Sequence, residues 1–334
     1  MSCSTNSADL AGCGPSPDAG GAGPMSILAA PSVVIVGCTA TGKSALALAL
    51  ARRAGNVELL SADSMQVYRG MDIGTAKPSA VERAEAPHHL IDLVGIEDSF
   101  SVSDFQRAAA AASAEVFARG NRSVVVGGTG LYLQAVVDGL VLPGQFPEVR
   151  AELEAEADIG ALHRQLHMLD PLAASRMEPS NRRRIVRALE VTVGSGRPFS
   201  SFGPGLTAYP PIEHRLIGLR MERARLSARI EARIRAQLDA GWLEEIRSLD
   251  ANSGGRWSAT AAQALGYREL RVHLAGQCTL AEAVDRTVIR TRQFARRQER
   301  WFRRDPRIRW LDAELVAANP MAVAATLLED WPQP

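Results

Sequence analysis

The chain has 334 residues, 46% of them hydrophobic, and a formal net charge of only +1. That length and composition can fill a sizeable core, and the balanced charge means that any nucleic-acid surface must come from local clustering. Four cysteines without CxxC or Cys/His spacing predict neither a disulfide framework nor a zinc site, which fits a reducing cytoplasm.

The N-terminal residues 1–30 are rich in Gly, Ser, Ala and Pro and lack both a basic start and a continuous apolar core. They predict a disordered leader rather than a signal peptide. Apolar runs at 33–36, 57–60 and 123–126 alternate with segments of helical length, including alanine-rich stretches at 45–53 and 105–119. This pattern is typical of buried parallel strands in an α/β protein. No run of about 18 apolar residues occurs, so no membrane span is expected.

The character of the chain changes at 143–204, where charged helices are bracketed by Pro/Gly segments. We interpret this region as a basic, all-helical insertion. The P-loop-like α/β core is then expected at 31–142 and 205–313, with a strand at His214–Arg220 and long arginine-rich helices to about residue 306. Residues 314–334 are assigned to a C-terminal tail.

The stretch GCTATGKS has P-loop spacing and lies between a predicted strand and a predicted helix. In such loops the backbone N–H groups surround phosphate oxygens, the lysine neutralises charge, and the hydroxyl can bind Mg²⁺. The alternative is a loop that only caps the helix. The predicted phosphate-binding residues are Gly37, Cys38, Thr39, Ala40, Thr41, Gly42, Lys43 and Ser44.

The second and third apolar runs deliver polar residues at their carboxyl ends. Asp63 follows the second run. Gly127 and Gly128, which would let a ligand approach the backbone, and then Thr129 follow the third, where a P-loop hydrolase would usually have an aspartate. In an open α/β sheet these strand ends face the ligand crevice, so Lys43, Asp63 and Thr129 should converge. They predict deprotonation of an acceptor while a phosphate group departs or is transferred. The alternatives are an N-capping Asp63 and a plain turn residue at Thr129.

Arginines recur every four residues along one predicted helix, at Arg225, Arg229 and Arg233, beside an apolar series. This basic edge could reach the phosphates or form a solvated face that pairs with Glu222 and Glu231.

Two further segments have competing interpretations. The segment 290–309 interleaves arginine with aromatic residues; taken alone, it favours an amphipathic core helix over an RNA-stacking surface. His88 and His89 are interpreted as structural rather than as metal ligands.

Several phrases occur together in one order: GCTATGKS, SADSMQVYRGMDIGTAKP, APHHLIDL, VVVGGTGLY, RRRIVRALEV, ALGYRE and RTRQFARRQERWFR. On these motifs the chain resembles the tRNA dimethylallyltransferases, also called tRNA isopentenyltransferases, from about Val33 to Asp312. It departs from the family pattern at Cys38, where proline is usual, and at Thr41, where serine is usual.

The resemblance implies transfer of the prenyl group of dimethylallyl diphosphate to the exocyclic amine of the adenosine 3′ of the anticodon in tRNA. It implies Asp63 as the base, Thr129 near the reacting groups, Arg233 on the diphosphate, and Ser44 beside Mg²⁺. The residues expected to line the adenine pocket are Ser64, Met65 and Gln66. The residues expected to contact the anticodon stem are Arg150, Arg183, Arg184 and Arg187.

We also expect a cytoplasmic monomer. Three rival functions are a small-molecule P-loop kinase that uses ATP, an adenylate isopentenyltransferase acting on free AMP or ADP, and a noncatalytic RNA chaperone. The basic insertion is larger than a mononucleotide needs, and a chaperone would have no need for Asp63.

Overall fold

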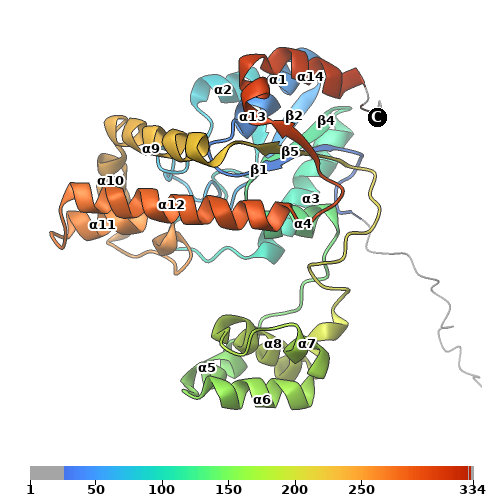
Figure 1. Cartoon of the computed structure of the whole chain (residues 1–334), viewed down its shortest axis with the longest axis vertical. Helices are drawn as coiled ribbons and strands as arrows, with labels where there is room; N and C mark the ends of the chain where they lie inside the picture. The colour runs from blue at the N-terminus through green and yellow to red at the C-terminus, as the bar shows by residue number, and fades with distance from the viewer. Residues whose placement is uncertain (1–25, 330, 332–334) are drawn as a thin grey trace, which may run out of the picture.

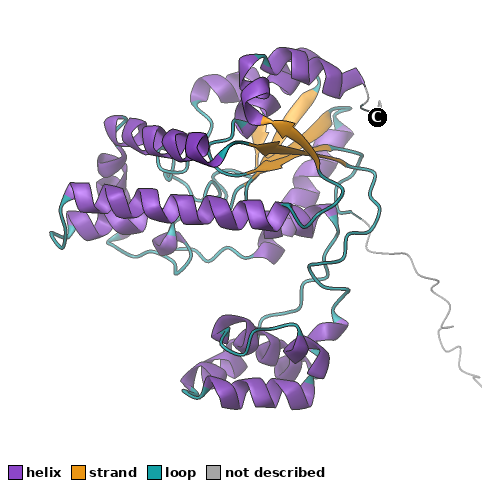
Figure 2. Ribbon diagram, viewed as in Figure 1, coloured by secondary structure: helices purple, strands orange, loops and turns teal. Residues whose placement is uncertain are grey.

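A computed structural model describes residues 26–329 and 331. Its centre is a six-stranded parallel sheet with the strand order β3-β2-β4-β1-β5-β6 (Figures 1 and 2). The strands are β1 (Val33–Gly37), β2 (Val57–Ala62), β3 (His88–His89), β4 (Arg122–Gly127), β5 (Arg215–Arg220) and β6 (Arg309–Asp312). The predicted α/β class is confirmed, and the four predicted strands lie at β1, β2, β4 and β5. The short edge strands β3 and β6 were not predicted.

Helices surround the sheet and continue beyond it. The helices of the core are α1 (Lys43–Ala54), α2 (Ala80–Glu85), α3 (Val102–Ala118), α4 (Gly130–Val137), α9 (Arg223–Asp239), α10 (Trp242–Ser253), α11 (Tyr267–Leu274), α12 (Leu280–Phe302), α13 (Ala313–Ala318) and α14 (Pro320–Glu329), with a 3₁₀ turn at Ala261–Gln263. No helix within the described residues is long and apolar enough to cross a membrane.

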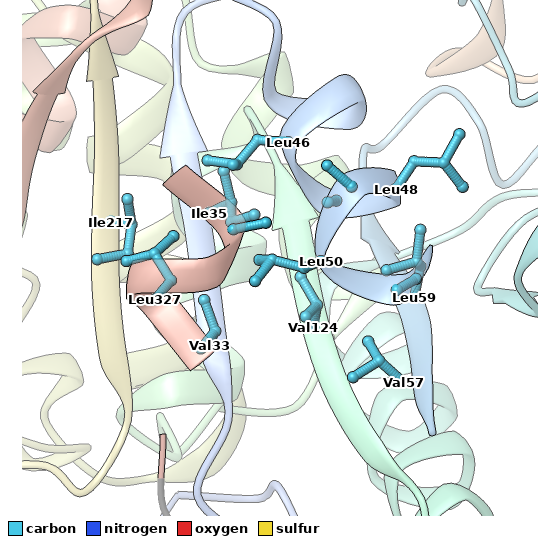
Figure 3. Close-up of a cluster of buried hydrophobic side chains, with 14 of the residues drawn as sticks. Val33, Ile35, Leu46, Leu48, Leu50, Val57, Leu59, Val124, Ile217 and Leu327 are labelled. Atoms are coloured by element: carbon cyan, nitrogen blue, oxygen red, sulfur yellow. The ribbon is translucent and has the colours of Figure 1, made fainter. Parts of the chain in front are cut away.

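Alternation along β1 divides the core into two layers. Val33 and Ile35 pack toward α1 and α14, where Leu46 and Leu327 meet them (Figure 3). Val34 and Val36 face the opposite side, which α3, α4 and the end of α12 cover. Because both faces are buried, the strands are almost continuously apolar, which explains why their sequence pattern was recognisable.

The ends of the described chain belong to this core, which corrects two predicted boundaries. Leu28 is buried and the Ala29 N–H donates to Ser113 Oγ at 2.9 Å, so residues 26–30 are not part of a free leader. The predicted tail forms α13 and α14, and Leu327 and Trp331 pack against α1. Residues 1–25 of the predicted leader lie outside the described residues.

The region 143–204 forms a separate helical body that two chain segments join to the core (Figure 1). Its own apolar cluster includes Leu166 and Ile185, which are fully buried. Its elements are α5 (Pro147–Ala155), α6 (Ile159–Leu169), α7 (Pro171–Ser175), α8 (Arg182–Ser195) and a 3₁₀ turn at Phe199–Ser201. With its own small core, it can hold a surface at a distance from the sheet.

Candidate active site

The phosphate loop joins β1 to α1. Gly42 is the N-cap of α1 and has φ +93°, and Gly37 has φ +147°. These backbone angles favour glycine, and a Cβ on Gly37 would lie 2.7 Å from the Leu219 carbonyl oxygen. Among the backbone N–H groups of residues 38–44, only that of Thr39 donates a hydrogen bond to another described residue. The loop therefore directs free amides and a helix N-terminus at one point, as anion sites do.

Two cations flank this loop. Lys43 Nζ donates to the Cys38 carbonyl at 2.6 Å, and Arg233 of α9 donates to Thr39 Oγ1 at 3.3 Å. Burial and the neighbouring Arg233 guanidinium lower the pKa of Lys43 from 10.5 to about 8. Burial also lowers the pKa of Arg233, against the attraction of Asp63. Two positive groups that repel each other in a partly buried place are stabilised by a bound anion.

Asp63 and Thr129 lie side by side at the ends of adjacent strands. The Thr129 hydroxyl accepts a hydrogen bond from the Ser64 N–H at 3.1 Å, and its backbone N–H donates to the Ala62 carbonyl at 3.3 Å. Asp63 Oδ1 accepts from the Met65 N–H at 2.8 Å, while Oδ2 accepts no hydrogen bond from the described residues. Asp63 therefore caps a turn, whereas the alternative expected it to cap a helix, and it keeps one oxygen free. Thr129 occupies the N-cap of α4 without a side-chain capping bond.

The glycines before Thr129 have a different role from the predicted one. A Cβ on Gly127 would collide with the Ala62 backbone, and a Cβ on Gly128 would collide with the Gln298 amide. They therefore permit close packing of β4 against β2 and α12, whereas we expected them to admit a ligand. This correction leaves Thr129 as the polar group presented by the turn.

A cleft of about 2400 Å³ runs from the phosphate loop to the helical insertion. The predicted site residues that line it in the core are Thr39, Ala40, Asp63, Ser64, Met65, Thr129 and Arg233; those in the insertion are Arg150, Arg183, Arg184 and Arg187. Gln66 does not line the cleft, contrary to expectation. Its Oε1 accepts a hydrogen bond from Ser61 Oγ at 2.7 Å, and its Nε2 donates to the carbonyls of Thr75 and Ala76.

The four insertion arginines differ in their surroundings. Arg150 pairs with Glu154 at 2.8 Å, and Arg187 pairs at 2.8 Å with Glu190, which is 1% exposed. Arg183 and Arg184 are exposed in the first turn of α8, and their side chains make no ion pair within the described residues. Across 143–204 eight arginines balance eight acidic residues, so the insertion is neutral as a whole and only the start of α8 is a basic cluster.

The other predicted basic surfaces are partly committed to the protein itself. Arg225 pairs with Glu314 at 2.6 Å. Of the three arginines on this edge of α9, only Arg233 lines the cleft. Helix α12 is amphipathic and buries Phe302, as the sequence alone favoured. Arg304 stacks over Trp301 with its guanidinium carbon 4.6 Å from the ring centroid. The aromatic ring is therefore already partnered on one face.

His88 and His89 have structural partners. His89 Nε2 lies 2.5 Å from Glu58 Oε2, and His88 Nδ1 lies 2.8 Å from the Ala86 carbonyl. Across the part of the chain that the structure describes, no group of three or more His, Cys, Asp or Glu side chains is placed to hold a metal ion.

One site residue, Gln298, was missed by sequence reasoning. Its Oε1 accepts the Thr39 N–H and its Nε2 donates to the Gly128 carbonyl, both at 2.9 Å. It therefore joins the phosphate loop to the turn that carries Thr129. The motif RTRQFARRQERWFR contains it, but that motif was interpreted only through its charges and rings.

Fold and site together define an α/β protein with a P-loop-type anion cradle, a carboxylate and a hydroxyl in one cleft. The chain belongs to the IPP transferase family, whose model matches residues 66–305; a second model, isopentenyl transferase, matches residues 32–98. The resemblance stated from the motifs is thereby confirmed.

Curated relatives and solved structures agree with this assignment. The tRNA dimethylallyltransferase of Acidothermus cellulolyticus is 48% identical over 90% of this chain and 93% of its own, and that of Streptomyces coelicolor is 45% identical over 91% and 97%. A full-length tRNA isopentenylpyrophosphate transferase from Bacillus halodurans matches with a TM-score of 0.61 and 37% identity, covering 90% of this chain and 99% of that one. A eukaryotic dimethylallyltransferase acting on tRNA matches with a TM-score of 0.73 and 25% identity, covering 91% and 80%.

Proposed function

We propose that this enzyme transfers the dimethylallyl group of dimethylallyl diphosphate to the exocyclic amine of the adenosine 3′ of the anticodon in tRNA, releasing diphosphate. One observation carries the proposal: a single cleft is lined by Thr39 and Ala40 of the phosphate loop, by Asp63 and Thr129, and by the exposed arginines of α8. Family membership and the names of the relatives support the same reaction.

The phosphate loop holds the leaving group. The N–H groups of residues 40–44 are available as donors, whereas the Thr39 N–H is already bonded to Gln298. Lys43 and Arg233 supply positive charge where negative charge grows as the allylic carbon–oxygen bond breaks. Donors placed in advance at such a point stabilise the transition state more than the ground state.

Asp63 is the base. The amine of adenine is conjugated with the ring and is a weak nucleophile, so it must be aligned with the allylic carbon and lose a proton. As the nitrogen–carbon bond forms, that proton passes to Asp63 Oδ2, while the bond from the Met65 N–H to Oδ1 fixes the carboxylate. The hydroxyl of Thr129, held against the turn at Ser64, lies beside the reacting groups.

Mg²⁺ fits this site as an ion held mainly by diphosphate oxygens. The Ser44 hydroxyl is exposed in the first turn of α1 and makes no hydrogen bond within the described residues, so it is the protein donor that the loop offers. Mg²⁺ commonly keeps several waters and binds through one or two protein oxygens and substrate phosphates. When bound, it supplies further neutralisation of the leaving group.

The insertion holds the anticodon arm. Arg183 and Arg184 add charge to the positive N-terminal end of α8, which has no acidic residue in its first turn. Such a place favours a phosphate, and phosphate contacts position an RNA without reading its sequence. Arg150 and Arg187 also line the cleft. The target adenine must be unstacked and extruded to reach Asp63.

Two assays with Mg²⁺ test the proposal: labelled dimethylallyl diphosphate offered with tRNA or AMP, and ATP offered with a small alcohol. We expect label on tRNA alone, with release of diphosphate. Label on AMP would identify an adenylate prenyltransferase, and ATP consumption with the alcohol would identify a kinase. RNA binding without transfer to any acceptor would indicate a chaperone.

A further inference from the structure

The turn 72–77 lies between the Asp63 loop and α2, and one carboxylate from α10 organises it. Glu245 Oε2 accepts the N–H groups of Asp72 and Ile73, at 2.9 and 2.6 Å. Its Oε1 accepts the Gly74 N–H at 3.2 Å and the Tyr267 hydroxyl at 2.5 Å. Four donors from two parts of the chain therefore converge on Glu245, which fills the about four acceptor sites of a carboxylate.

The carbonyl side of the same turn leads to the site. The Thr75 carbonyl oxygen accepts from Gln66 Nε2 at 3.2 Å and from Arg233 at 3.5 Å. Gln237, one helical turn after Arg233, donates to the carbonyls of Ile73 and Gly74 at 2.6 and 3.1 Å. The turn thus joins the arginine beside the phosphate loop to the glutamine behind the Asp63 loop.

The turn also has little freedom to move. Lys77 Nζ is fully buried and donates to the Tyr68 carbonyl at 2.8 Å and to carboxylate oxygens of Asp72 and Asp92 at 2.6 Å. An ammonium satisfies three acceptors compactly, which the larger planar guanidinium would not do in the same space. A Cβ on Gly74 would collide with the Trp242 ring. Displacement at Glu245 would therefore be transmitted to Thr75 rather than absorbed locally.

We propose that Glu245 is a positioning residue for the transfer reaction. It holds the turn 72–77 so that the Thr75 carbonyl keeps Arg233 over the phosphate loop and keeps Gln66 in place behind Asp63. Glu245 does not itself line the cleft, whereas Arg233 does. The inference rests on the proposed function, because it assigns to Arg233 the leaving diphosphate of that reaction.

A substitution of equal size tests this role. Glu245→Gln replaces one acceptor oxygen with an N–H donor that opposes the donors of the turn or of Tyr267. We expect the Kd for inorganic diphosphate and the KM for dimethylallyl diphosphate to rise about tenfold, as for loss of one charge-assisted contact, with the KM for tRNA changed less. Glu244→Gln is the matched control, because Glu244 is exposed on the same helix and, among the described residues, forms an ion pair only with Arg247, at 3.1 Å.

A double-mutant cycle separates positioning from general destabilisation. If Glu245 acts through Arg233, adding Glu245→Gln to Arg233→Ala will weaken diphosphate binding little further, because the arginine is already lost. Fully additive effects, or a lower melting temperature with unchanged diphosphate affinity, would overturn the inference. If Glu245→Gln does not fold, Tyr267→Phe, which removes one of the four donors, enters the same cycle.

Failure of this inference is distinguishable from failure of the proposed function. Diphosphate binding is measured by calorimetry on the full chain without RNA or transfer. A wild-type protein that binds diphosphate in the Glu245-dependent way but transfers no label to tRNA would reject the reaction and retain the positioning role.

Discussion

Thr39 and Gln298 lie 259 residues apart in the sequence, and a 2.9 Å hydrogen bond joins the Thr39 N–H to Gln298 Oε1. The other end of the same amide donates to the Gly128 carbonyl. Helix α12 thereby fixes the distance between the phosphate loop and the turn that carries Thr129. The spacing of leaving group and acceptor depends on a helix from the far end of the chain.

Removal of this amide should weaken both ends of the site. In Gln298→Ala the partly buried Thr39 N–H and the buried Gly128 carbonyl lose their partner, which costs about 1–3 kcal/mol of stability, and we expect kcat to fall about tenfold. Gln134→Ala is the matched control, since Gln134 is also buried but makes a 3.4 Å bond to Leu206 away from the loop. Thermal unfolding and transfer assays check both; equal kcat in the two variants would contradict the role of Gln298.

Asp63→Asn should separate chemistry from binding. The amide oxygen can still accept the Met65 N–H, so the turn is retained, but the group can no longer take a proton. We expect kcat to fall by about 10²–10⁴, the usual contribution of a general base, with tRNA affinity within a few-fold of wild type. Single-turnover transfer and filter binding measure the two effects. Unimpaired turnover would refute the assignment of the base.

The pKa of Lys43 predicts a pH dependence of diphosphate binding. Below its pKa of about 8 the free protein carries the ammonium, and above it the charge is lost. A bound diphosphate stabilises the ammonium, so binding above pH 8 should take up a proton and weaken as pH rises. Calorimetry between pH 7 and 9.5 in buffers of different ionisation enthalpy measures both quantities. A flat profile, or one unchanged in Lys43→Met, would contradict the prediction.

The same shift affects the stability of the ligand-free protein. The pKa of Lys43 in the folded protein lies below its value of 10.5 in the unfolded chain, so the unfolded chain binds more protons between about pH 8 and 10.5. The free energy of unfolding should therefore gain, from Lys43, up to about 3 kcal/mol as pH rises through that window. At pH 7 Lys43 is charged in the folded protein, so the full cost of burying its ammonium is present. Lys43→Met should therefore unfold at a higher temperature than wild type. Chemical denaturation at pH 7 and 9.5 checks the sign.

Two neighbouring arginines of α8 should behave differently. Arg184→Ala removes an exposed charge, so we expect weaker tRNA binding, a salt slope reduced by about 1 and unchanged stability. Arg187→Ala leaves buried Glu190 without its closest partner and should cost about 3–5 kcal/mol. Filter binding at several salt concentrations and thermal melts distinguish them. Equal loss of stability in both would argue against a free phosphate-binding role for Arg184.

The C-terminal helix should contribute to stability and not to the reaction. Leu327 is 2% exposed against α1, and its change to Ala should cost about 2–5 kcal/mol. Leu315→Ala is the control, because Leu315 is 72% exposed and surface changes of this kind stay within about 0.5 kcal/mol. Urea unfolding measures both. A wild-type midpoint for Leu327→Ala would show that α14 does not stabilise the core.

Features with a local sequence signal could be predicted. Strands buried on both faces are continuous apolar runs, a phosphate loop needs its glycines and lysine at fixed spacing, and polar residues after adjacent parallel strands must meet at one edge of the sheet. For these reasons β1, β2 and β4 and the convergence of Asp63 with Thr129 could be predicted.

The pairing of distant polar groups could not be predicted, because it depends on how the helices pack. Gln298, Glu245 and Arg187 lie in helices whose sequences show a polar position but not its partner, because a hydrogen bond depends on where the helix packs. Gln66 was misplaced because residues 64–66 form a turn, and nothing in their order says which side chain faces inward. The C-terminal segment belongs to the core because its apolar residues Leu327 and Trp331 pack against those of α1, and no local sequence pattern reveals this contact.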